Sequence, residues 1–209
     1  MSYYRVVCVN LTLQTADSSV YSFKILSSET RKWRMSNEIL SCEPSQFLNM
    51  VVPIFFNGAL HWLRELGDIV AFHIEKEHAQ TIKLPQGVRA LPIGGYSNVW
   101  FGSIDGYINL LQVSRGEMVI WVLEDLDNVK WQKRRRFQIE GMKHHRRNIP
   151  LFFNGKQIVY SSKSDWGVHF KFYVYNIQIN RTEKIVTSDE WMDHCRIFFH
   201  YISNMVGVF

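Results

Sequence analysis

Residues 55–58 read Phe55-Phe56-Asn57-Gly58, and the same four residues recur as Phe152-Phe153-Asn154-Gly155. Ile104-Asp105-Gly106 lies between them. The three Asn-Gly or Asp-Gly pairs begin at residues 57, 105 and 154, so they are 48 and 49 residues apart. Such a pair between apolar runs indicates a two-residue β-hairpin, because both central residues of a type I′ turn need a positive φ. The spacing therefore predicts an internal repeat with one hairpin per unit.

The residues after each hairpin also repeat. A second apolar strand follows at residues 69–72, 118–121 and 172–175. After a polar turn comes a further strand whose apolar anchor is predicted to be buried: Ile82, Trp131 and Ile185. The first segment shows only the later half of the unit, with Trp33 as its anchor. Four strands per unit predict an all-β fold of antiparallel four-stranded, blade-like repeats of about 48 residues, a partial or small β-propeller.

The chain has 209 residues, a length that suits one all-β domain. We expect a single β-propeller-like domain over residues 1–209, with repeats at roughly residues 3–45, 50–97, 98–147 and 148–206. Propellers have roughly 4–8 blades, so four units make either a small ring or a partial set. Because the first unit starts part-way through, we expect a partial set from a longer protein. The one short helix that the pattern allows lies near residues 188–195.

Cysteine usage and hydropathy bear on the compartment. Cys8, Cys42 and Cys195 are odd in number and far apart, so we expect no disulfide framework and a reducing compartment. Cys8 stands in an apolar run and is predicted to be a buried small hydrophobe. No apolar stretch reaches roughly 18 residues, and the N-terminus lacks the features of a secretory signal. We therefore expect no membrane contact and a cytoplasmic or nuclear protein.

Several segments together carry a resemblance to one family. They are residues 4–9, 21–33, 56–63 with 69–72 and Leu84-Pro85, 120–125 with Trp131, and 200–206. Residues 56–63, with Asn57-Gly58 and Leu60-His61-Trp62-Leu63, are the most specific part. In combination these segments resemble the F-box associated domain of plant F-box proteins, over roughly residues 3–206. His73 departs from the pattern, because the family usually has Asp after the residue that matches Phe72.

The resemblance implies a function. Proteins of this family act as substrate receptors of Skp–cullin–F-box ubiquitin ligases, in which the F-box docks a Skp-type adaptor and the associated domain captures the target. No helical F-box precedes the domain in this sequence, so we expect adaptor binding only through an F-box that this chain lacks. The partner implied is a target protein of unknown identity. The resemblance implies no enzymatic activity and no cofactor.

The basic residues form the main candidate surface. The net charge is +5, and residues 130–147 hold eight Lys or Arg against one Glu. The candidate partner-binding residues in this segment are Lys133, Arg134, Arg135, Arg136, Arg146 and Arg147. Such a run can bind phosphate or an acidic protein, act as a nuclear import signal, or form a solvated strand and loop between blades. Nucleic acid is the less favoured partner, because Trp131 and Phe137 are interpreted as inward-facing anchors rather than base-stacking platforms.

Loops give a second candidate surface. Residues 89–97, 141–148 and 162–168 are expected to be exposed connections, and such loops on rigid scaffolds often carry recognition. Trp166 lies in the last of them. It is a partner-binding anchor if it is exposed and blade core if it is buried, and the sequence leaves both open.

The histidines and cysteines give little evidence of a metal site. His144 and His145 would point to opposite faces of a strand, and the His194-Cys195 pair with His200 matches no zinc spacing. His61 occupies a repeat position and is interpreted as structural. We therefore expect no metal site.

The sequence contains no Gly-x-Ser-x-Gly, no His-Glu-x-x-His and no phosphate-loop motif. The pairs Glu124-Asp125 and Glu75/Glu77 are interpreted as solvated turn carboxylates, and we expect no catalytic residue. The alternative functions are a basic β-propeller that binds nucleic acid or an anionic ligand, and a sugar-hydrolysing propeller. The second would need two carboxylates facing each other.

Overall fold

The computed structural model describes residues 3–47, 52–65, 67–88, 92–93, 96–114, 116–139, 142, 145–164 and 170–187. All regular elements within these residues are antiparallel β-strands, which confirms the predicted fold class. The first sheet has three strands: β1 (Arg5–Gln14), β2 (Ser19–Ser27) and β3 (Lys32–Cys42). The second has four: β4 (Ile54–Phe56), β5 (Ala59–Leu63), β6 (Asp68–His73) and β7 (His78–Lys83).

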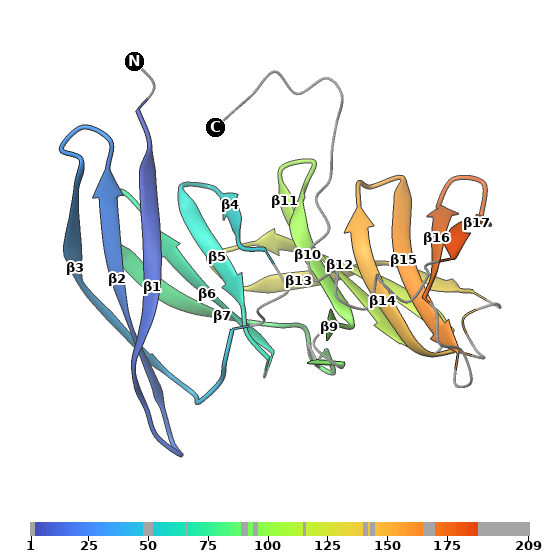
Figure 1. The fold of residues 1–209 in the computed structure, drawn as a ribbon, viewed down its shortest axis with the longest axis horizontal. Coiled ribbons are helices and arrows are strands. Elements are labelled where there is room, and N and C mark those ends of the chain that lie inside the picture. The colour runs from blue at the N-terminus through green and yellow to red at the C-terminus, as the bar shows by residue number, and fades with distance from the viewer. Residues whose placement is uncertain are drawn as a thin grey trace.

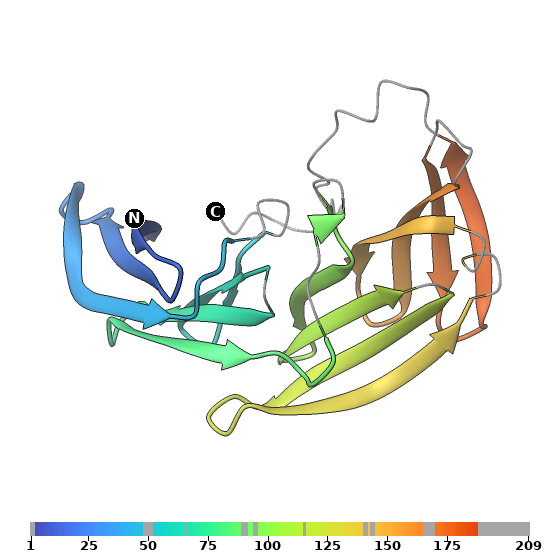
Figure 2. The same cartoon turned by 90° about the horizontal axis from the view of Figure 1, so that it is seen from below.

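Two further four-stranded sheets follow. The third contains β10 (Val99–Ile104), β11 (Tyr107–Ser114), β12 (Glu117–Asp125) and β13 (Lys130–Gln138). The fourth contains β14 (His145–Phe153), β15 (Gln157–Ser164), β16 (Lys171–Asn176) and β17 (Arg181–Thr187). A small hairpin, β8 (Pro92–Ile93) with β9 (Tyr96–Ser97), precedes the third sheet. The four sheets stand side by side in chain order (Figure 1), and the view from below shows them along an arc with the first and last sheets at its ends (Figure 2).

Two of the three predicted hairpin turns are confirmed. Asn57 and Gly58 have φ values of 48° and 76°, and Asp105 and Gly106 have 51° and 75°. Both are two-residue turns, which close between Phe56 and Ala59 in the second sheet and between Ile104 and Tyr107 in the third. Positive φ at both central positions is the signature of a type I′ turn.

The third hairpin differs, although its sequence repeats the first. Its last pair is Phe153 with Ile158, so four residues form the connection, and the Asn154 side-chain oxygen accepts hydrogen bonds from two backbone N–H groups within it. A bulge between Pro150 and Phe152 accompanies the longer turn. Because side chains alternate between faces, this shift places Phe153 where Phe55 lies in the second sheet.

The hydrophobic core lies between neighbouring sheets. Tyr21, Phe23 and Phe72 belong to the cluster between the first two sheets, in which the rings of Phe23 and Phe72 stack at 4.3 Å. Equivalent clusters fill the second and third interfaces. Each inner sheet is thus buried on both faces, whereas an end sheet has a neighbour on one face.

The burial of the predicted anchors follows this arrangement. Ile82 is fully buried and Trp131 packs against the same core, as predicted. Trp33 is 51% exposed and Ile185 is also exposed, so both of these predictions are wrong. Trp33 lies on the outer face of the first sheet, and Ile185 is the extra residue of a bulge in β17 at the other end of the arc.

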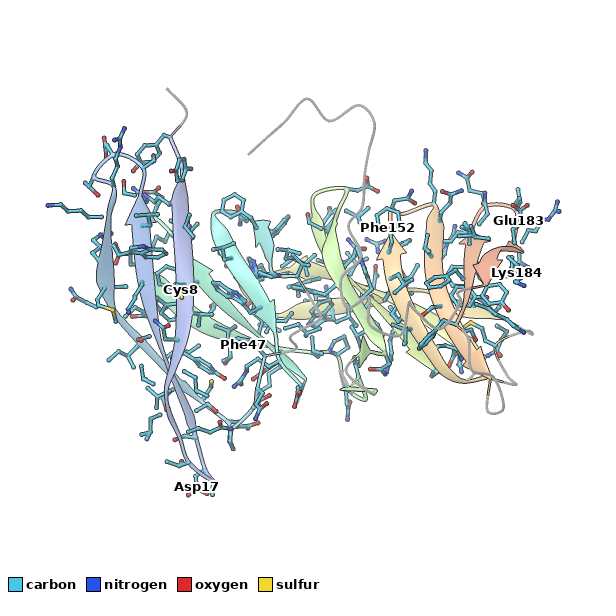
Figure 3. The ribbon with its side chains drawn as sticks, viewed as in Figure 1. Cys8, Asp17, Phe47, Phe152, Glu183 and Lys184 are labelled. Carbon is cyan, nitrogen blue, oxygen red and sulfur yellow. The ribbon has the colours of Figure 1, made fainter. Side chains whose placement is uncertain are left out.

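The prediction that Cys8 is buried is also wrong. Cys8 lies midway along β1 with its side chain exposed (Figure 3). Its neighbours Val7 and Val9 pack against the buried cluster between the first and second sheets. Because side chains alternate along a strand, Cys8 points to the outer face.

A buried ion pair joins the first two sheets. Arg64 is fully buried, and its Nε donates to Asp68 Oδ1 at 2.6 Å while Nη1 donates to the carbonyl of Glu43 at 2.9 Å. Glu43 belongs to the segment that leads from β3 to the second sheet. Phe47, from the same segment, lies between the two sheets and packs against Tyr21 (Figure 3). The described residues include no helix that is long and apolar enough to cross a membrane.

Candidate partner-binding surface

Four of the basic candidate residues lie together on one strand. Lys133, Arg134, Arg135 and Arg136 all lie in β13, the outer edge strand of the third sheet. Arg146 and Arg147 are placed by their backbone in β14, the inner strand of the next sheet. Trp166 lies outside the described residues. The structure therefore groups four of the seven candidates and leaves the side chains of the other three without a position.

Carboxylates on the neighbouring strand neutralise two of the arginines. Arg134 Nη2 donates to Glu124 Oε1 at 2.7 Å, and Arg136 forms an ion pair with Glu117. Glu117 and Glu124 stand at opposite ends of β12, beside β13. Neither pairing is evident from the run of basic residues in the sequence. Glu117 pairs across the sheet with Gln138, and Glu124 lies in the bulge between Leu123 and Asp125, so both ion pairs are diagonal contacts that a simple hairpin register does not reveal.

Of the other two candidates on β13, Lys133 contacts an aromatic ring and Arg135 lies on the opposite face. Lys133 Nζ lies 4.8 Å from the ring centre of Trp121, within the range of a cation–π contact. Arg135 pairs across the sheet with Ile120, on the face towards the fourth sheet. There burial raises the pKa of Tyr175, and the positive charge of Arg135 opposes that rise. Among the four candidates on β13, Arg135 is the one without an ion pair or a cation–π contact within the described residues.

Trp131 and Phe137 serve as anchors, as the sequence analysis interpreted them. Trp131 Nε1 donates to the carbonyl of Lys83 at 2.8 Å, which ties β13 to the second sheet. Phe137 packs edge-to-face on Tyr175 of the fourth sheet, with ring centres 5.3 Å apart. Both rings hold neighbouring sheets together and are not free to stack on bases.

The carboxylates interpreted as solvated turn groups make specific contacts. Glu75 pairs with Arg5 at 2.7 Å, and Glu77 pairs with Arg34, so the turn between β6 and β7 is tied to the first sheet. The Arg34 side chain holds the pKa of Glu77 below its ordinary value. Asp125 instead accepts hydrogen bonds from the Asn128 side chain and backbone N–H, at 2.7 and 3.0 Å, which lower its pKa. These contacts give each carboxylate a structural role in the described region.

The predicted loops are partly regular structure. Residues 92–93 and 96–97 form the hairpin of β8 and β9, while residues 145–148 begin β14 and residues 162–164 end β15. The expectation that these three ranges are loops throughout is therefore wrong. Strand pairing extends further towards the sheet ends than turn residues alone indicate.

His61 is a core residue, in agreement with its structural interpretation. It is fully buried on β5, and neither ring nitrogen makes a hydrogen bond within the described residues. Burial lowers its pKa to about 4, opposed by the nearby carbonyls of Ala59 and Ile54. In the part of the chain that the structure describes, no three His, Cys, Asp or Glu side chains group together as metal ligands would.

Known proteins with similar sequences are F-box proteins. A putative F-box protein of Arabidopsis thaliana is 22% identical over 209 residues, covering 95% of this chain and 48% of the relative. An F-box protein of the same plant is 29% identical over 151 residues, covering 69% of this chain and 45% of the relative. A putative F-box/kelch-repeat protein is 32% identical over 84 residues, covering 38% and 19%. The chain spans about half the length of the first two relatives.

Solved structures give weaker matches. The β-propeller domain of the Trilobed protease from Pyrococcus furiosus matches with a TM-score of 0.37 and 10% identity, covering 88% of this chain and 57% of that one. The WD40 domain of SCAP from fission yeast matches with a TM-score of 0.42 and 10% identity, covering 89% and 48%. The model of the F-box associated β-propeller domain matches residues 1–206. The chain therefore belongs to the F-box associated β-propeller family.

Proposed function

We propose that this chain is a target-recognition module. It captures a protein so that a Skp–cullin–F-box ubiquitin ligase can ubiquitinate it, and it runs no reaction itself. The observation that carries the proposal is the match to the F-box associated domain over residues 1–206. Its relatives are F-box proteins about twice as long as the matched region.

The surface of β13 supports a protein as the partner. Lys133, Arg134 and Arg136 already contact Trp121, Glu124 and Glu117 respectively. A surface that holds a phosphate backbone depends on uncompensated cations, because Lys and Arg supply most of the electrostatic attraction. Arginines and aromatic rings are instead enriched at protein interfaces.

Arg135 is the residue of this strand that we expect to contact the target. It is exposed, and in the described region it has no ion-pair partner. Arginine is enriched among the residues that dominate binding energy at protein interfaces. An acidic or phosphorylated segment of the target would suit it.

The proposal is tested with the chain fused behind an F-box and expressed in plant cells. We expect the fusion to recover the adaptor together with a protein target, and the target to be ubiquitinated when the ligase is reconstituted. The chain without the F-box should capture the same target without its ubiquitination. Arg135→Glu should weaken capture, while the matched change Lys156→Glu, in an exposed turn of the fourth sheet, should leave it intact.

The alternative function makes a different prediction in the same experiment. If the chain binds nucleic acid, generic RNA or DNA should be recovered, with an affinity that falls steeply as salt rises. Recovery of nucleic acid without any protein target would contradict the proposed function.

A further inference from the structure

The outer edge of β13 is open, whereas neighbouring side chains close the outer edge of β7. In β7, the backbone N–H of Ala79 donates to Glu38 Oε1 of the first sheet at 2.7 Å. At the other end of β7, the carbonyl of Lys83 accepts a hydrogen bond from the Trp131 indole at 2.8 Å. Among the described residues, no hydrogen bond from outside the third sheet reaches the backbone of β13. Figure 2 shows β13 along the convex side of the arc, where a further strand has room to pair with it.

The side chains of β13 carry one sign of charge. The strand contains Lys130, Lys133 and residues 134–136, all basic, and no Asp or Glu. Every side chain from Gln132 to Arg136 is exposed. The edge strands β3 and β17 instead mix both signs, as Glu183 beside Lys184 illustrates. β13 therefore combines an open backbone edge with a positively charged surface.

Two cations of this edge have no carboxylate partner within the described residues. Arg134 and Arg136 are paired with carboxylates of β12, but Lys133 and Arg135 are not. Lys133 lies with Trp121 on the face towards the second sheet, and Arg135 lies on the face towards the fourth. Successive side chains of an extended partner also point to opposite faces. Such a partner can therefore bring one carboxylate to each of the two cations.

We propose that an extended acidic segment of the target protein adds to the outer edge of β13, with carboxylates at Lys133 and Arg135. The inference rests on the proposed function, because it names the kind of segment that the target offers. Strand addition is a recurring mode of peptide recognition, in which main-chain hydrogen bonds supply affinity and side chains supply specificity. The charges of β13 select the acidic partner.

The same features disfavour a second copy of this chain as the occupant. Two copies of β13 would bring cations against cations, and basic residues and bulges on an edge strand are common means of preventing such pairing. The bulge at Arg134 also interrupts the regular edge, so continuous main-chain pairing is limited to the residues on one side of it. Because that pairing is short, the carboxylates have to supply part of the affinity, and binding should weaken as salt rises.

The test uses the full chain and a defined acidic peptide. The probe is a fluorescein-labelled peptide in which two adjacent Glu residues stand between alternating Thr and Val residues, and fluorescence anisotropy measures its binding. A matched peptide of the same sequence carries a methyl group on every backbone nitrogen, so it keeps both carboxylates but cannot donate main-chain hydrogen bonds. We expect the methylated peptide to bind about tenfold more weakly or worse. Hydrogen exchange should show new protection in β13 when the unmethylated peptide is bound.

Variants of the chain test the two cations. Lys133→Gln and Arg135→Gln should each weaken binding of the acidic peptide by about tenfold, because each removes a hydrogen bond to a charged group. The matched control is Lys184→Gln, which removes an exposed cation from the mixed edge of β17 and should leave binding unchanged. All three positions are exposed, so urea unfolding should give the same midpoint for every variant.

Several results would overturn the inference. Equal binding of the methylated peptide would show that the contact is electrostatic alone, and no binding of the acidic peptide would exclude the site. Tighter binding of a single-stranded oligonucleotide of the same charge would identify nucleic acid as the ligand instead. If the F-box fusion captures its target equally well with Lys133→Gln and Arg135→Gln, the inference fails while target recognition stands. If the fusion captures no protein target, the proposed function itself fails.

Discussion

The buried pair of Arg64 and Asp68 makes the sharpest stability prediction. Arg64 is 0% exposed, and two of its nitrogens bond to the Asp68 carboxylate. Burial is the largest influence on the Arg64 guanidinium and acts to lower its pKa, but the hydrogen bonds to Asp68 and Tyr21 together with the negative charge of Asp68 outweigh it, so the pKa is raised and the charge remains. Asp68→Asn removes the compensating charge and leaves a cation in the interior. Breaking a buried pair in this way costs about 3–5 kcal/mol of the free energy of unfolding.

The location of the pair decides how the loss should show. Arg64 also donates to the carbonyl of Glu43 and lies 5.7 Å from the ring centre of Tyr21, so it holds the segment that joins the first two sheets. We expect Asp68→Asn to loosen the first sheet before the rest. Urea unfolding followed by tryptophan fluorescence measures the stability, and hydrogen exchange shows whether β1–β3 open first.

A matched control lies in the same segment. Lys83 Nζ and Glu43 Oε1 are 3.3 Å apart, but both side chains are mostly exposed. Glu43→Gln should therefore cost less than about 1 kcal/mol, as surface ion pairs usually do. If Asp68→Asn costs no more than Glu43→Gln, the reasoning about burial and compensation is wrong.

Four further changes have expected outcomes. Folding holds the pKa of His61 at about 4, below its ordinary value, so the unfolded chain binds the extra proton first as the pH falls. The contribution of neutral His61 to stability is therefore present above about pH 6.5 and is lost as the pH falls towards 4. His61→Asn, which copies Asn109 of the third sheet, should flatten that part of a pH–stability curve. Gly106→Ala should lower the free energy of unfolding in urea by about 1–2 kcal/mol, because φ is 75° and a Cβ there meets open space. Gly58→Ala should cost more, because its Cβ would also lie 3.0 Å from Nε2 of His73. Trp131→Phe should lower the unfolding midpoint, because it removes the hydrogen bond from the indole to the second sheet.

The repeat was readable from the sequence because each unit repeats its own local signals. Asn57-Gly58 and Asp105-Gly106 specify their turns within a few residues, and the structure has both as predicted. Asn154-Gly155 carries the same signal and forms a longer turn. The difference comes from the bulge before Phe152, which resets the register of the strand. A bulge depends on how two strands pair, so the dipeptide alone does not reveal it.

The candidate surface likewise has features that the local sequence shows and features that depend on how two strands pair. The arginines of β13 were evident as a charge run, but their neutralisation by Glu117 and Glu124 depends on the register of β12 against β13. The contact of Lys133 with Trp121 depends on that register too. Counting charges along the chain therefore overstates the positive charge that the surface offers to a partner.

The two tryptophan anchors show why burial could not be read from the repeat alone. Trp131 pairs with Leu123 and Trp33 pairs with Leu26, in equivalent rows of equivalent sheets. Trp131 meets the second sheet and packs into the core, whereas Trp33 faces the side on which no described sheet lies. The local sequence decides which face of a strand a side chain occupies, and the neighbouring sheet decides whether that face is buried. A repeat therefore predicts burial in the interior of the arc better than burial at its ends, and the exposure of Trp33 is consistent with its correct assignment to a strand.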